Sequence, residues 1–120
     1  MRHLISLEDV TRDDIDRIFA VSENLKRKLA DGLRPRLLSR RVLGLLFEKQ
    51  SLRTRVSFEA GMTHLGGSST YLGADVGWGK RESVADFSRV LSEYIDVVVC
   101  RAKDHATVQE LAHHSNCPVI

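Results

Sequence analysis

The sequence predicts an α/β fold, a three-layer αβα domain built around a parallel sheet of four or more strands. Strand-like and helix-like patterns alternate four times along the 120 residues. The connections between successive strand candidates are too long for hairpins, which favours parallel strands joined by helical crossovers. Two of the strand candidates are almost continuously apolar, as is typical of strands that are covered on both faces.

A helix is expected first, over residues 11–31, where apolar side chains recur at helical spacing. Thr11 is a suitable N-cap, and Asp13 and Asp14 place negative charge in the first turn, where the helix dipole favours it. Gly32 closes the segment. The pattern predicts one long amphipathic helix.

The next unit is a strand followed by a helix. Residues 42–48 form a short apolar run of the kind that a buried strand shows. From Leu52 or Arg53 the apolar positions change to helical spacing, and Gly66 and Gly67 end that helix.

The rest of the chain repeats the alternation, with short apolar runs between segments of helical spacing. In chain order these are a weaker strand at 68–73, a helix at 82–94, a strand at 95–102, a helix at 108–115 behind a Thr107 cap, and the start of a fourth strand at 117–120.

Length and charge limit the classes of function. Basic and acidic residues number 18 and 16 and are interspersed, so neither a nucleic-acid-binding stripe nor an acidic tail is indicated. The N-terminus lacks a signal-peptide pattern and no apolar run has membrane-spanning length, so we expect a cytoplasmic protein with no membrane partner. Because 120 residues make about one domain, an active site in this chain is expected to be half of a site.

The stretch FEKQSLRTRV places hydroxyl groups and positive charge directly after the first buried strand. In parallel sheets ligands bind beyond the carboxyl ends of strands, where the next helix presents unpaired N–H groups. Ser51 and Thr54 offer hydroxyls, and either Arg53 or Arg55 offers a charged contact, since helix positions two apart cannot face one ligand. The alternative is a solvated helix start in which Ser and Thr are plain caps.

The stretch FEKQSLRTRVSFEAGMTHLGG resembles the phosphate loop and following helix of the carbamoyltransferases, most closely those that act on ornithine, which typically read Phe-Glu-Lys-x-Ser-Thr-Arg-Thr-Arg. Residues 79–120 are similar to the same family's third helix, third strand and fourth helix. The resemblance implies that residues 1–120 are the carbamoyl-phosphate-binding domain of a two-domain enzyme whose amino-acid-binding domain is absent.

Carried over residue by residue, the resemblance implies that carbamoyl phosphate is bound by Ser51, Arg53, Thr54 and Arg101 and by the backbone N–H of Leu52. Of these, Arg53, Thr54 and Arg101 are the expected catalytic residues, because they face the charge that develops on the carbonyl oxygen and phosphate. The implied reaction transfers the carbamoyl group to the side-chain amine of ornithine, which the missing domain would bind, and gives citrulline and phosphate.

The resemblance further implies a homotrimer and a reaction that needs neither a metal nor an organic cofactor. Cys100 and Cys117 lack the paired spacing of a zinc site and are expected to be ordinary reduced thiols. In the Gly-rich segment 73–83, Trp78 and Lys80 are candidates for reaching a neighbouring subunit's site, although such a segment is also typical of a flexible crossover.

One position departs from the family pattern, because Leu52 stands where threonine is usual. The change removes a hydroxyl, worth about 1 kcal/mol, but keeps the backbone donor. It also resembles the branch that acts on acetylornithine or succinylornithine. The acceptor therefore stays open between ornithine and N-acetylornithine or another amine, and non-catalytic phosphate-binding and trimerisation modules remain as alternatives.

Overall fold

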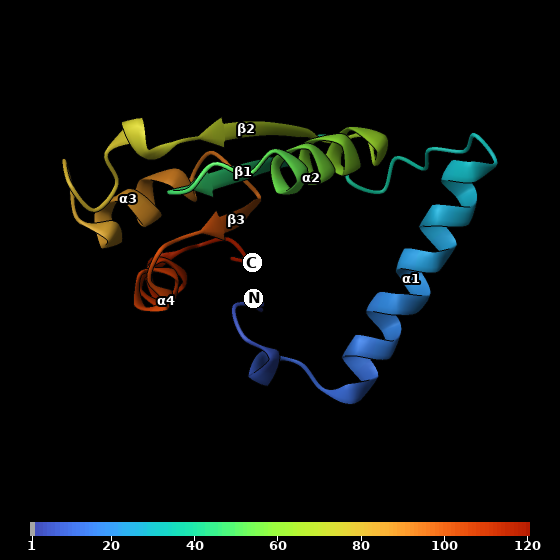
Figure 1. The fold of residues 1–120 in the computed structure, drawn as a ribbon, viewed down its shortest axis with the longest axis horizontal. Helices are drawn as coiled ribbons and strands as arrows, with labels where there is room; N and C mark the ends of the chain where they lie inside the picture. The colour runs from blue at the N-terminus through green and yellow to red at the C-terminus, as the bar shows by residue number, and fades with distance from the viewer. Residues whose placement is uncertain (1) are drawn as a thin grey trace.

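The computed structural model describes residues 2–120 and has the predicted alternation of strands and helices (Figure 1). Two short 3-10 helices, η1 (Leu7–Asp9) and η2 (Ala74–Val76), were not predicted from the sequence. The other elements are α1 (Arg12–Ala30), β1 (Val42–Phe47), α2 (Leu52–His64), β2 (Ser68–Leu72), α3 (Val84–Leu91), β3 (Val97–Arg101) and α4 (His105–His114).

The sheet is parallel, and its three strands lie in the order β2-β1-β3. The prediction of four or more strands is not confirmed. The segment that follows α4 does run beside the outer edge of β3, where the Ile120 N–H donates to the Val98 carbonyl at 2.9 Å. Among the residues described, the two segments share one isolated parallel bridge, between Val98 and Val119, and it is not a full strand pairing.

Helices cover both faces of the sheet, as the predicted three-layer arrangement requires. Alternate residues of β1 point to opposite faces. Leu45 is fully buried in the core that includes Met62 of α2, while Leu46 is buried in the core that includes Leu111 of α4. The central strand is therefore enclosed, and its carboxyl end is held at a fixed place at the edge of the sheet.

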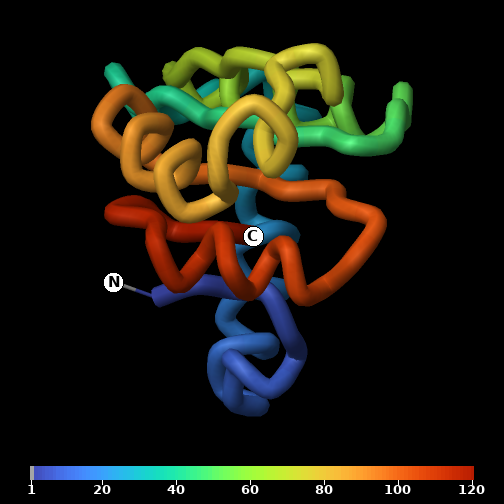
Figure 2. The backbone as a smooth tube through the Cα atoms, turned by 90° about the vertical axis from the view of Figure 1, so that its left-hand side faces the viewer, coloured from blue at the N-terminus to red at the C-terminus, as the bar shows by residue number. Residues whose placement is uncertain are grey.

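The two ends of the chain lie side by side. The Leu4 N–H donates to the Val119 carbonyl at 2.8 Å, and Figure 2 shows the blue N-terminal segment running next to the red C-terminal one. The N-terminal segment therefore packs on the side of the sheet that α3 and α4 cover.

Helix α1 begins as the sequence predicts but stands away from the sheet (Figure 1). Thr11 caps it, accepting from the Asp14 N–H, and the Asp14 carboxylate accepts in return from the Thr11 N–H. The Arg2 guanidinium, and after it the N–H and hydroxyl of Thr11, donate to the Asp14 carboxylate and hold its pKa well below its usual range. None of the residues of α1 is buried, and Phe19 is 64% exposed.

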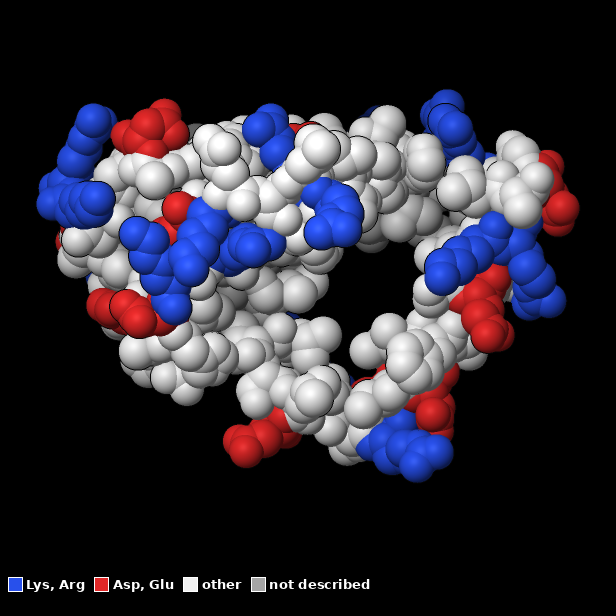
Figure 3. Space-filling view, in the orientation of Figure 1, with Lys and Arg blue, Asp and Glu red and all other residues white. Residues whose placement is uncertain are grey.

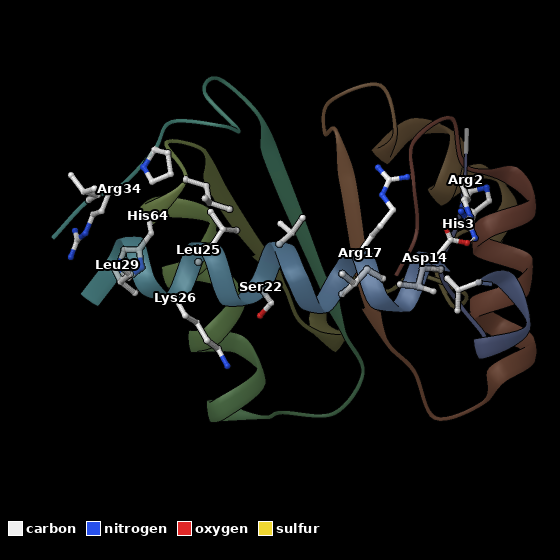
Figure 4. A pocket seen from close by; sticks show the side chains of 18 residues that line it. Arg2, His3, Asp14, Arg17, Ser22, Leu25, Lys26, Leu29, Arg34 and His64 are labelled. Carbon is white, nitrogen blue, oxygen red and sulfur yellow. Dashed lines mark hydrogen bonds and ion pairs between the residues drawn. The ribbon is translucent and has the colours of Figure 1, made fainter. Parts of the chain in front are cut away.

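A groove separates α1 from the rest of the domain and forms a cavity of about 740 Å³ (Figure 3). Ile18, Val21, Leu25 and Leu29 line it from α1, and Leu65 lines it from the end of α2. Figure 4 shows Leu25 and Leu29 among the side chains that surround this space, which we call the α1 groove.

Two helix starts differ from the sequence-based expectation. α4 begins at His105 with Asp104 as its N-cap, so Thr107 lies inside the first turn and its N–H donates to the Asp104 carbonyl at 3.2 Å. Asp104 makes no side-chain capping bond, but no Gly or Pro lies between it and Thr107, so the helix extends to the earlier residue. α3 begins later than expected, behind Ser83, whose hydroxyl accepts from the Asp86 N–H. Among residues 2–120, no helix is both long and apolar enough to span a bilayer.

Candidate anion-binding site

The first turn of α2 lies just beyond the carboxyl end of β1. Ser51 is the N-cap residue, but its hydroxyl makes no capping bond to the backbone and donates instead to Thr54 Oγ1 at 2.9 Å. The first backbone bond of the helix runs from the Arg55 N–H to the Ser51 carbonyl. The N–H groups of Leu52, Arg53 and Thr54 therefore have no intrahelical acceptor, which is the condition for anion binding at a helix N-terminus.

Arg101 reaches the same place from β3. It is the last residue of that strand and pairs in register with Phe47 at the end of β1. Its Nη1 lies 3.4 Å from Thr54 Oγ1, which is long for a hydrogen bond. The fold thus brings Ser51, Thr54 and Arg101 together, although Arg101 is 47 residues away from Thr54 in the chain.

The two arginines of the loop are in different surroundings. The Arg55 guanidinium lies over the Tyr71 ring, 3.7 Å from its centroid, and Arg55 Nε donates to Glu59 Oε1 at 3.2 Å. Arg53 is exposed and makes no ion pair or side-chain hydrogen bond within residues 2–120. Arg55 is thus held by contacts within the domain, whereas the Arg53 guanidinium is free to contact a ligand. This geometry is consistent with the prediction that only one of these two arginines faces a ligand.

Leu52 carries a large apolar side chain that is 78% exposed at the mouth of the site. The Leu52 side chain does not pack into the domain, so the residue can contribute to an anion site only through its N–H.

The Gly-rich segment presents only one of its two candidate residues to solvent. Trp78 is 6% exposed, and its ring centroid lies 6.1 Å from that of Phe87 on α3. Its side chain therefore packs within its own domain, and the expectation that Trp78 reaches a neighbouring subunit's site stays a prediction. Lys80 is exposed. The indole is large and apolar, and its burial in the α3 core outweighs exposure on a loop.

The two thiols are not activated. Burial, followed by the charge of Glu48, raises the pKa of Cys100 to about 12, and burial also raises the pKa of Cys117. Both are free thiols. Within residues 2–120, no three His, Cys, Asp or Glu side chains gather in an arrangement that could hold a metal ion.

The α1 groove is separate from the helix N-terminus. None of the residues Ser51, Leu52, Arg53, Thr54 and Arg101 lines it. The groove is mainly apolar, whereas the first turn of α2 offers N–H donors, hydroxyls and guanidinium groups. The residues expected to bind an anion are therefore those of the first turn of α2, together with Arg101, and not those of the groove.

Sequence reasoning missed Glu48, the residue directly after β1. Its N–H donates to the Arg101 carbonyl at 2.9 Å, and its Oε2 accepts from the Lys103 N–H at 3.2 Å. The only signal in the sequence was a carboxylate beside a basic loop, which by itself is typical of a solvated strand end.

Comparison with known proteins identifies the family of the chain. Residues 2–120 match the family model described as the aspartate/ornithine carbamoyltransferase, carbamoyl-P binding domain. The chain is 41% identical to the ornithine carbamoyltransferase of Wolinella succinogenes over 121 aligned positions, which cover 100% of this chain and 39% of that protein.

Solved structures give the same result. The ornithine carbamoyltransferase of Pyrococcus furiosus is 42% identical with a TM-score of 0.96, and the match covers 99% of this chain and 38% of that one. The catalytic subunit of M. jannaschii aspartate transcarbamoylase is 31% identical with a TM-score of 0.89, and the match covers 100% of this chain and 40% of that one. The chain spans about two fifths of the length of these relatives.

Proposed function

The chain belongs to the aspartate/ornithine carbamoyltransferase family, and we propose that it forms the part of such an enzyme that binds carbamoyl phosphate. In this proposal Ser51, Thr54 and the N–H groups of Leu52 and Arg53 bind the phosphate. Arg101 lies beside the carbonyl oxygen, and Arg53 closes over the phosphate from the outside.

One observation carries the proposal. Arg101 Nη1 and Ser51 Oγ both approach Thr54 Oγ1, at 3.4 Å and 2.9 Å, at a helix N-terminus whose N–H groups have no capping side chain. Donors from the start of α2 and from the end of β3 thus converge on a point where an anion would receive backbone and side-chain bonds together. The Ser51 hydroxyl makes no capping bond, so a plain helix cap does not describe this turn, and it gives no reason for Arg101 to reach the same point.

The chemistry follows from where negative charge develops. When an amine attacks the carbonyl carbon, negative charge builds on the carbonyl oxygen while the bond to phosphate breaks and phosphate leaves with that electron pair. Donors already directed at both groups stabilise the transition state more than the ground state. Arg53, Thr54 and Arg101 are proposed for this role, and the departing phosphate is a suitable acceptor for the amine proton.

The acceptor would be bound by the part of a longer enzyme that this chain lacks relative to its relatives. We propose the side-chain amine of ornithine, giving citrulline and phosphate, because several of the relatives matched over the whole chain are ornithine carbamoyltransferases. The exposed Leu52 side chain supports N-acetylornithine as a second candidate, since an apolar group at the mouth of the site suits a less polar acceptor.

Assembly is also part of the proposal. A homotrimer would place the exposed Lys80 of one subunit near the α2 site of the next, whereas Trp78 would hold that segment in place. The 120-residue chain by itself is expected to form no citrulline, because nothing in it orients an acceptor, and orientation accounts for about 7 to 11 kcal/mol of barrier lowering in enzymes.

Calorimetric titration of the chain with fresh carbamoyl phosphate and with inorganic phosphate tests the proposal. We expect the donor to bind more tightly than phosphate, and we expect Arg101→Ala to remove that difference, because Arg101 is assigned to the carbonyl half. Arg89→Ala, which removes an exposed arginine on α3, is the control and should change neither affinity. Equal affinities for the two ligands in the unmodified chain would contradict the proposed function.

A further inference from the structure

The two halves of the candidate site come from different segments of the chain. Ser51 to Thr54 follow β1, and Arg101 ends β3. Among the described residues, the one side-chain hydrogen bond between these two segments is the 3.4 Å approach of Arg101 Nη1 to Thr54 Oγ1. A contact of that length constrains the relative position of two segments weakly, so their alignment depends on other bonds.

Glu48 supplies those bonds from the residue between β1 and the loop. Its N–H donates to the Arg101 carbonyl at 2.9 Å, which extends the pairing of β1 with β3 by one step. Its Oε2 accepts from the Lys103 N–H at 3.2 Å, two residues beyond Arg101. One half-buried residue, three positions before Ser51, thus holds the backbone at Arg101 and at Lys103, directly after the Arg101 side chain.

The segment after Arg101 has little else to hold it. Across residues 2–120, the bond from the Lys103 N–H to Glu48 is the only hydrogen bond that ties positions 102–104 to a different part of the chain. The next bond along the segment is local, from the Thr107 N–H to the Asp104 carbonyl. Without the Glu48 carboxylate, the turn from β3 into α4 would lose its fixed distance from the loop before α2.

Charge and geometry make opposite predictions for Glu48. A carboxylate beside an anion site repels the ligand, so by charge alone its removal should tighten binding. By geometry its removal should weaken binding, because Arg101 would spend less time in the position from which it reaches the ligand. The sign of the effect therefore separates the two roles.

We propose that Glu48 is a positioning residue, which aligns Arg101 with the first turn of α2 through its bonds to the backbone at Arg101 and Lys103. This rests on the proposed function, since it assigns Glu48 a role in carbamoyl-phosphate binding. Glu48 itself does not touch the ligand in this arrangement.

Two variants of the chain test the role with the ligands named above. Glu48→Asp keeps the charge but shortens the side chain, and should weaken carbamoyl-phosphate binding about fivefold, the effect of losing one hydrogen bond. Glu48→Gln keeps an acceptor oxygen at the same reach and should bind within about twofold of the unmodified chain. Inorganic phosphate, which lacks the carbonyl group assigned to Arg101, should be affected less than carbamoyl phosphate by Glu48→Asp.

A double variant tests whether Glu48 acts through Arg101. In the Arg101→Ala background, Glu48→Asp should cause no further loss of affinity, because the side chain that it positions is gone. Asp86→Asn, which changes an exposed carboxylate on α3, is the matched control and should bind as the unmodified chain does. Far-ultraviolet circular dichroism and the unfolding midpoint establish that each variant is folded.

The outcomes that overturn the role are distinct from those that overturn the function. Unchanged or tighter donor binding by Glu48→Asp, or an additive loss in the Arg101→Ala background, would overturn the positioning role and leave the proposed function intact. If the unmodified chain bound no carbamoyl phosphate, the proposed function and this role would both be wrong. If Glu48→Asp did not fold, weaker donor binding by Glu48→Gln than by the Asp86→Asn control would overturn the assignment, and equal binding would support it.

Discussion

The Arg55 guanidinium lies over the face of the Tyr71 ring, 3.7 Å from its centroid, and so links the first turn of α2 to β2. The same side chain pairs with Glu59 at 3.2 Å. Arg55 is therefore occupied by contacts within the domain, and Arg53, two residues earlier, is left facing solvent. The division of roles between the two arginines leads to the first prediction.

Arg53→Ala and Arg55→Ala should have opposite consequences. Loss of Arg53 should weaken carbamoyl-phosphate binding about tenfold or more, the range for a charged hydrogen bond, with little change in unfolding free energy. Loss of Arg55 should lower the unfolding free energy by about 1 kcal/mol through its aromatic and ionic contacts. Titration calorimetry and urea unfolding of both variants are the measurements. Equal effects of the two substitutions on binding would contradict this division.

Leu52→Thr should tighten the binding of inorganic phosphate by up to about tenfold, because it adds a hydroxyl beside the N–H groups of the first turn. Leu52 is exposed, so the substitution should not disturb the core. Leu52→Ala is the control, since it removes the same apolar side chain without adding a donor. Weaker phosphate binding by the threonine variant than by the alanine variant would mean that the added hydroxyl does not reach the anion.

Gly67→Ala and Gly61→Ala should change stability in opposite directions. A Cβ on Gly67 would lie 2.9 Å from the Arg41 carbonyl oxygen and 3.0 Å from that of Leu38, and backbone atoms cannot easily move away. We expect a loss of about 1 to 3 kcal/mol in unfolding free energy. Gly61 lies inside α2 and a Cβ there meets nothing within 4 Å, so alanine should stabilise the helix by up to about 1 kcal/mol. Chemical denaturation measures both, and destabilisation by Gly61→Ala would contradict the packing described for α2.

Acid should destabilise the domain in part through Asp96. The Val42 N–H and then the Arg41 guanidinium hold the pKa of Asp96 below its ordinary value. A carboxyl group with a lowered folded-state pKa contributes stability that is present above the unfolded-state pKa of about 4 and is lost as the pH falls through the folded-state value. Between about pH 5 and about pH 3, the melting temperature of the Asp96→Asn variant should therefore fall less than that of the unmodified chain. An identical acid-induced decrease in both proteins would contradict this role.

The order of strands and helices could be predicted because it depends on local spacing. The Thr11 cap and the apolar run before Glu48 have the expected positions, and the resemblance placed Arg101 at the end of a strand. Spacing alone left Arg53 and Arg55 open and the resemblance favoured Arg53, but the contact that occupies Arg55 depends on Tyr71, a residue from another strand. Asp104 in place of Thr107 as a cap reflects two suitable residues competing within one turn.

Other features are tertiary and leave no local signal. Trp78 is buried because Phe87 of α3 packs beside it, which the composition of a Gly-rich segment does not reveal. The amphipathic pattern of α1 predicts a helix correctly, yet none of its residues is buried in this domain. Glu48 acquires its contacts only when β1 and β3 pair, so a charge at a strand end gave no indication of them.

The central claim is that carbamoyl phosphate binds at the first turn of α2, which holds the phosphate, and beside Arg101, which reaches the carbonyl oxygen. Amide and guanidinium chemical shifts of the isotope-labelled chain, recorded by nuclear magnetic resonance during titration with carbamoyl phosphate, test it most directly. We predict that the largest shifts occur at the N–H groups of Leu52, Arg53 and Thr54 and at the Arg101 side chain, with little change along the α1 groove. Shifts confined to other parts of the chain, or no shifts at these four residues at saturating ligand, would contradict the account.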